Sequence, residues 1–149
     1  MPQVSFIVPG EPQGKARART WFDPRVGRTV SKTPENTVVY ENLVKLCYQS
    51  ASRNHRFPDD MPLQVEIRAY FSIAKRTAKK WLPGMLMGLI RPTRKPDVDN
   101  ITKAVLDALN QVAYKDDSAI VKFSIEKIYS DTPRVEVRIG EWEAPQNGQ

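Results

Sequence analysis

Five carboxylates lie in one short stretch of an otherwise basic chain, at Asp97, Asp99, Asp107, Asp116 and Asp117. The chain has a single His and a single Cys, so a metal here would need oxygen ligands. Clustered carboxylates suit Mg²⁺ or Mn²⁺. Such a metal can polarise a phosphodiester and lower the pKa of an attacking water. The stretch therefore predicts metal-dependent phosphodiester hydrolysis.

An apolar stripe predicts the helix that would position these groups. It consists of residues at helical spacing, namely Ile101, Ala104, Val105, Ala108, Leu109 and Val112. The helix should begin near Asp99, which places Asp99, Lys103 and Asp107 within about 80° on the opposite face. Lys103 could then offset negative charge in a transition state or orient the water.

The flanking carboxylates could join this face. Pro96 keeps the chain extended, so Asp97 and Asp99 can point to the same side. Asp117, at the start of the next strand, could return to the beginning of the helix if that strand runs antiparallel to it. A simpler interpretation stays open, in which Asp97 or Asp99 only caps the helix and Asp99, Lys103 and Asp107 form ion pairs along it.

Two basic segments flank this acidic stretch, and the whole chain carries a net charge of +6. Nucleic acid is the commonest large anionic partner, although charge alone does not distinguish it from others. Residues 15–32 hold six cations and one acid around Trp21 and Phe22, and residues 67–96 hold eight cations and no acid. The expected DNA contacts are Lys15, Arg17, Arg19, Lys75, Arg76, Lys79, Lys80, Arg94 and Lys95. An equally open interpretation of the first segment is a solvated hairpin with Trp21 packed beneath it.

The remaining pattern predicts an α+β fold, with a small mixed or antiparallel sheet packed against two main helices. Strands are expected over residues 4–8 and 63–70, and a β-hairpin over 118–129 and 135–139. A helix should start at Thr33 as N-cap with Pro34 in its first turn and end near Ser52. Its core face would be Val38, Val39, Leu43, Leu46 and Cys47. The apolar residues 85–90 should face the core, with a loop anchor or an interface patch as the open alternatives.

Length and composition narrow the class of protein. The 149 residues predict one domain over 1–143, followed by a frayed polar end at 144–149. A single Cys excludes an intramolecular disulfide and a Cys-rich zinc module. No apolar run approaches membrane-spanning length, which predicts a cytoplasmic protein without membrane contact.

The acidic stretch resembles the RusA family of Holliday-junction resolvases. The matching residues are 95–100, Lys103, 107–110 and 116–118, and further similarity extends over 8–17 and 33–41. The resemblance covers most of residues 4–139, whereas 72–94 depart from the family pattern.

This resemblance implies an intertwined homodimer of α+β subunits that cuts four-way DNA junctions by paired symmetric nicks and requires Mg²⁺ or Mn²⁺. It implies a metal site at Asp97, Asp99 and Asp117 and an essential Lys103. A dimer also suits the two-fold symmetry of the junction. We therefore expect a junction-resolving endodeoxyribonuclease of phage or prophage recombination and repair. The alternatives are a DNA-binding accessory protein whose acids only cap and pair, or a nuclease for other branched DNA.

Overall fold

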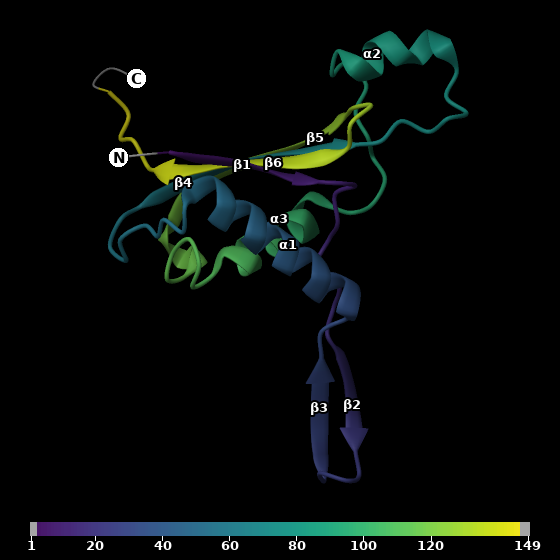
Figure 1. Ribbon diagram of the computed structural model, residues 1–149. Coiled ribbons are helices and arrows are strands. Elements are labelled where there is room, and N and C mark those ends of the chain that lie inside the picture. The colour runs from purple at the N-terminus through teal and green to yellow at the C-terminus, as the bar shows by residue number, and fades with distance from the viewer. Residues whose placement is uncertain (1–2, 147–149) are drawn as a thin grey trace.

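The computed structural model describes residues 3–146, which form one four-stranded sheet, one separate hairpin and three α-helices. The elements are β1 (Val4–Pro9), β2 (Arg19–Asp23), β3 (Arg28–Lys32), α1 (Glu35–Ser52), β4 (Leu63–Phe71), η1 (Lys79–Trp81), α2 (Leu82–Leu86), α3 (Val98–Leu109), η2 (Asp117–Ala119), β5 (Ile120–Tyr129) and β6 (Arg134–Glu141). Helices α1 and α3 cover one face of the sheet (Figure 1). The predicted α+β class is confirmed.

The four-stranded sheet has the order β1-β6-β4-β5. Strand β4 lies inside it, antiparallel to β6 and parallel to β5. Alternate β4 residues, from Leu63 to Phe71, are buried under the helices. The expected hairpin of β5 with β6 is therefore wrong, because β4 lies between them and the link at residues 130–133 crosses its end. Alternation identifies a strand but does not choose its partner.

Helix α3 has the predicted apolar face. Ile101, Ala104, Val105, Ala108 and Leu109 are all buried in the main core, which they share with α1 and the sheet. The helix begins at Val98, so Asp99 lies in its first turn. This packing fixes which face of α3 points to solvent.

The prediction for α1 needs two corrections. Pro34 occupies the N-cap position without a side-chain cap, so Thr33 does not cap the helix. The buried face is Thr37, Tyr40, Val44 and Tyr48. Of the predicted face, Leu43 and Cys47 pack against the core half-buried, whereas Val38, Val39 and Leu46 are exposed. Aromatic rings bury more surface than β-branched side chains, and the hydroxyl of Tyr48 donates to the carbonyl of His55 at 2.7 Å. The tyrosines therefore set the face that packs.

Strands β2 and β3 form an arm (residues 19–32) that projects away from the body (Figure 1). The predicted hairpin is present, but Trp21 is 46% exposed and does not pack beneath it. The second projection carries α2, beyond the opposite side of the sheet (Figure 1). Met85 is buried there, while Leu86, Met87 and Leu89 are exposed, so the expectation that residues 85–90 face the core is wrong.

No helix within residues 3–146 has the length and apolar character needed to cross a membrane. Residues 144–146 carry no helix or strand, and the rest of the predicted frayed end, 147–149, lies outside the described residues. The single-domain boundary at 143 stays a prediction.

Candidate active site

The start of α3 presents two carboxylates that have no hydrogen-bond or ion-pair partner among the described residues. Asp97 occupies the N-cap position in extended backbone, with φ −72° and ψ 157°, yet its side chain makes no cap hydrogen bond. Asp99 follows in the first helical turn. Within residues 3–146, neither carboxylate accepts a hydrogen bond or joins an ion pair. The capping interpretation therefore does not account for them.

Lys103 and Asp107 lie one and two turns further along the same helix. No ion pair joins Lys103 to Asp99 or Asp107 within the described part of the chain. Instead, the ammonium of Lys15 donates to Oδ2 of Asp107 at 2.7 Å and lies 3.6 Å from the carboxylate of Glu41. This hydrogen bond to Asp107 is the main reason that the pKa of Lys15 is raised. The predicted pairing along α3 is thus replaced by a contact with the loop after β1.

That loop is fixed directly against the beginning of α3. The backbone N–H of Lys15 donates to the carbonyl of Asn100 at 3.0 Å. A Cβ added to Gly14 would lie 2.9 Å from Cβ of Pro96 and 3.0 Å from Cβ of Asn100. Only glycine permits this close approach. Lys15, predicted as a DNA contact, is therefore held in ion pairs with Asp107 and Glu41 of the same chain.

The second pair of acids approaches α3 from the segment after it. The backbone N–H of Asp117 donates to the side-chain oxygen of Asn110 at 3.1 Å. Asp116 accepts from the N–H of Ser118 at 3.1 Å, and hydrogen bonding from Ser118 lowers the pKa of the Asp116 carboxyl. Asp116 thus caps the short helix η2, while Asp117 remains available.

Asp117 shares its surroundings with the outward face of α3. Burial is the largest cause of its raised pKa, and the negative charges of Asp116 and Asp107 add to it. Lys103 acts in the opposite direction and lowers that pKa. Together with the hydrogen bond to Asn110, which follows the last turn of α3, this places Asp117 near the end of the helix and not, as expected, at its beginning.

Tyr114 supports this arrangement and was not predicted. Its ring is buried, and its hydroxyl donates to the carbonyl of Leu106 at 2.7 Å. Burial, followed by the charges of Asp117 and Asp107, raises its pKa. Tyr114 consequently fixes the segment between the two groups of acids to α3. The sequence signal that could have indicated this role is an aromatic residue placed between two acidic clusters.

Oxygen ligands for a divalent metal are present but are not gathered into one ready group. Among the described residues, no set of three or more His, Cys, Asp or Glu side chains lies close enough to hold a metal ion. Mg²⁺ commonly binds through one or two carboxylates and keeps several waters. The carboxylates of Asp97 and Asp99, which have no partner within residues 3–146, and that of Asp117 are hard oxygen donors of the type that such an ion takes.

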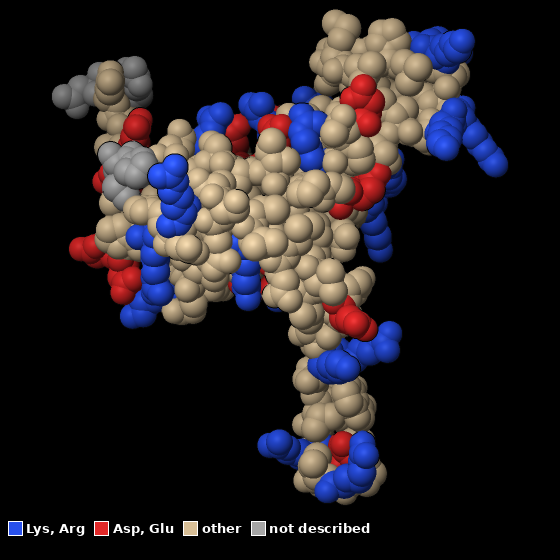
Figure 2. All heavy atoms as spheres, viewed as in Figure 1, with Lys and Arg blue, Asp and Glu red and all other residues tan. Residues whose placement is uncertain are grey.

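Some of the predicted DNA contacts lie on the projections, Arg19 on the arm and Lys79 and Lys80 in η1 next to α2, and Figure 2 shows Lys and Arg side chains gathered on both projections. Arg94 has a structural contact, because its guanidinium donates to the carbonyl of Ser72 at 2.9 Å and lies over the ring of Phe71. Lys80 lies 5.0 Å from the ring centre of Trp81. Within residues 3–146, no ion pair neutralises Arg17, Arg19, Lys75, Arg76, Lys79, Lys80 or Lys95.

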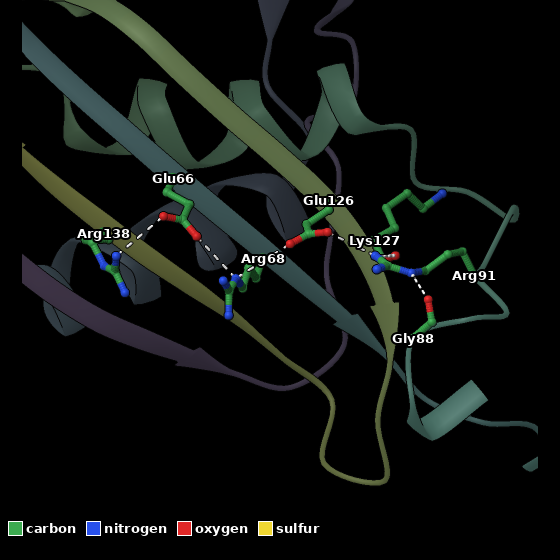
Figure 3. Close-up of polar contacts among 7 residues, drawn as sticks. All are labelled: Glu66, Arg68, Gly88, Arg91, Glu126, Lys127 and Arg138. Atoms are coloured by element: carbon green, nitrogen blue, oxygen red, sulfur yellow. Dashed lines mark hydrogen bonds and ion pairs between the residues drawn. The ribbon is translucent and has the colours of Figure 1, made fainter. Parts of the chain in front are cut away.

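The sheet face away from the helices has a different character. Figure 3 shows a row of alternating charges across it: Arg138, Glu66, Arg68, Glu126 and Arg91. Arg91 also donates to the carbonyls of Gly88 and Lys127, which fastens the α2 segment to β5. These cations are already paired with acids, so this face is a poorer site for phosphates than the projections.

Comparison with known proteins adds an independent line of evidence. Residues 9–140 match the family described as endodeoxyribonuclease RusA. The chain is 37% identical over 143 residues to the uncharacterized protein YqaN of Bacillus subtilis (strain 168), covering 93% of this chain and 96% of that protein. It is 28% identical over 86 residues to the crossover junction endodeoxyribonuclease rusA of Lactococcus phage r1t, covering 57% of this chain and 59% of that protein.

Proposed function

Because the chain belongs to the RusA family of endodeoxyribonucleases, we propose that it resolves four-way DNA junctions by paired, metal-dependent nicks. One structural observation carries the proposal: Asp97, Asp99 and Asp117 join no ion pair within the described residues, while Lys103 lies one helical turn from Asp99 and lowers the pKa of Asp117. The name of the Lactococcus phage relative supports the junction as substrate and phage or prophage recombination as context.

Asp97, Asp99 and Asp117 are the residues that would hold Mg²⁺ or Mn²⁺. When bound, the ion supplies Lewis-acid polarisation of the phosphate and a lowered pKa for the attacking water. Lys103 places a positive charge where negative charge grows in the transition state. Asp107 has a positioning role, since its ion pair with Lys15 fixes the basic loop beside the acids.

A DNA-binding accessory protein is the second candidate, and the absence of a gathered metal group within residues 3–146 favours it. In such a protein the acids would only cap helices and form ion pairs. Divalent metal separates the two, because a binding module should be indifferent to Mg²⁺. A nuclease for flaps or other branched DNA differs from a resolvase only in its substrate.

The test is cleavage of a labelled synthetic four-way junction, a flap and a matched linear duplex, with Mg²⁺ and with EDTA. We expect symmetric nicks on the junction alone, lost in EDTA and in Asp99→Asn, whose junction binding should survive. The exposed Asp60, between α1 and β4, provides the control Asp60→Asn, which should cut normally. Tight binding without metal-dependent cutting would support the accessory protein, and cutting of the flap alone would change the substrate.

A further inference from the structure

The arm does not contribute to the core that holds the body of the protein together. Within the part of the chain that the structure describes, β2 and β3 pair only with each other, and none of residues 19–32 belongs to the buried core. A two-stranded hairpin alone is at best marginally stable in water. Its function should therefore lie in what its two faces contact.

The strand register gives those faces different chemistry. Arg19 is paired with Lys32, Trp21 with Val30 and Asp23 with Arg28, while Phe22 is paired with Thr29. Because alternate residues share a face, two faces follow. The Trp21 face consists of Arg19, Trp21, Asp23, Arg28, Val30 and Lys32. The Phe22 face consists of Thr20, Phe22, Thr29 and Ser31.

Only the Trp21 face combines an exposed ring with unpaired cations. Arg19, Arg28 and Lys32 join no ion pair within residues 3–146, and the single acid of the face, Asp23, already pairs with Arg25 of the turn at 3.3 Å. A ring surrounded by cations suits a nucleic-acid strand, because every base can stack on an aromatic face and phosphates attract the cations.

We propose that the Trp21 face of the arm binds the branch point of DNA, with Trp21 stacked on an exposed base and Arg19, Arg28 and Lys32 on the neighbouring phosphates. This inference rests on the proposed function, since it takes branched DNA as the substrate. It assigns the Phe22 face no such contact, although Phe22 is the more exposed ring, at 62% against 46%.

The base of the arm is held next to the carboxylates of α3, so that one DNA molecule can be bound by the arm and cut at these carboxylates. Lys15 is bonded to Asn100 and Asp107 of α3, and the N–H of Ala16 donates to the hydroxyl of Thr37 at 3.2 Å. From Lys15 to Arg19 the chain can span at most about 14 Å. Each five-residue strand extends the arm by about 17 Å more. A branch held by the arm therefore stays within reach of the acids.

The chain offers a matched pair of variants, Trp21→Ala and Phe22→Ala, which truncate neighbouring rings on opposite faces. Binding to a four-way junction is measured in EDTA, so that cleavage does not interfere. We expect Trp21→Ala to raise the Kd for the junction about tenfold, as expected for loss of one base-stacking ring. Phe22→Ala should change it less than about twofold, and linear duplex affinity should change little in either variant.

Salt dependence tests the cations of the same face. Arg28→Gln and Lys32→Gln should each reduce the slope of log Kd against log salt by about one. Lys122→Gln, on the exposed surface of β5, is the control and should leave the slope unchanged.

Equal losses in Trp21→Ala and Phe22→Ala would overturn the proposal, because general disorder of the arm would explain them. The proposal would also be overturned if Trp21→Ala changed the molecular mass measured by sedimentation but not the affinity for the junction. That result would assign the arm to a contact between copies of the chain. The proposed function fails separately: wild-type protein that binds the junction in EDTA yet never cuts it in Mg²⁺ contradicts nuclease activity, while the comparison of the two rings still decides the role of the arm.

Discussion

At the residue scale, Asp117 is the carboxylate whose charge the fold disfavours most clearly. Its pKa is raised above 3.8, chiefly by burial and then by the charges of Asp116 and Asp107. A raised folded-state pKa means that folding favours the protonated form. That contribution to stability is complete below the ordinary pKa and is lost as the pH rises through the folded-state pKa. At neutral pH, ionised Asp117 therefore reduces the stability of the protein.

Asp117→Asn should accordingly raise Tm at neutral pH by about 1–2 °C, and the difference should vanish near pH 3. Thermal unfolding across this pH range measures it, with Asp60→Asn as the exposed control. Added Mg²⁺ should raise the Tm of the wild type more than that of Asp117→Asn, since a bound cation stabilises the ionised carboxylate. A Tm difference that does not depend on pH would show that the charge is not its cause.

The candidate site was partly predictable residue by residue. Helical spacing placed Asp99, Lys103 and Asp107 on one face of α3, because the apolar residues of that helix allow a single orientation. The partner of Asp107 was not predictable, since Lys15 lies far away in the sequence and meets it only through the tertiary fold. The same holds for Tyr114, whose role depends on a carbonyl of α3.

At the element scale, periodicity predicted where α3 and the sheet strands lie but not how the strands pair. The alternation in β5 and β6 would be the same in a hairpin as in the observed sheet, where β4 separates them. For α1, the apolar count pointed to Val38, Val39 and Leu46, whereas the tyrosines face the core. Patterns of hydrophobicity do not record ring size or the partner of a hydroxyl group.

The arm should be removable without loss of stability. Arg19 and Lys32 are paired across β2 and β3, so a two-residue Asn-Gly turn can replace residues 20–31. We expect Tm to change by less than about 2 °C, because the core loses nothing. Thermal unfolding checks this result.

Ile101→Ala provides the matching reference for the excised arm. It truncates a fully buried side chain of α3 and should cost about 2–5 kcal/mol of unfolding free energy. A comparable loss on removal of the arm would mean that the arm packs on the body, contrary to the structure.

At the scale of the whole molecule, charge is distributed unevenly. Both projections carry cations that join no ion pair within residues 3–146, while the sheet face away from the helices pairs its arginines with Glu66 and Glu126 (Figure 3). The net charge of +6 is therefore available to a polyanion mainly at the arm and the α2 segment, and α3, which carries the acids, lies between these two projections in Figure 1. DNA that contacts both projections would pass near those acids.

The proposed paired nicks require more than one copy of this site. One subunit carries a single set of Asp97, Asp99 and Asp117, whereas a four-way junction presents two symmetry-related strands to be cut. We therefore expect a dimer in sedimentation and linear product from a plasmid with an extruded cruciform. Wild type mixed with excess Asp99→Asn should form mostly mixed dimers that cut one strand, leaving nicked circles, which gel electrophoresis separates from linear DNA. If the amount of linear product instead fell only in proportion to the fraction of wild-type protein, each copy would be cutting independently of a partner. A mixed dimer could not then be the cutting unit.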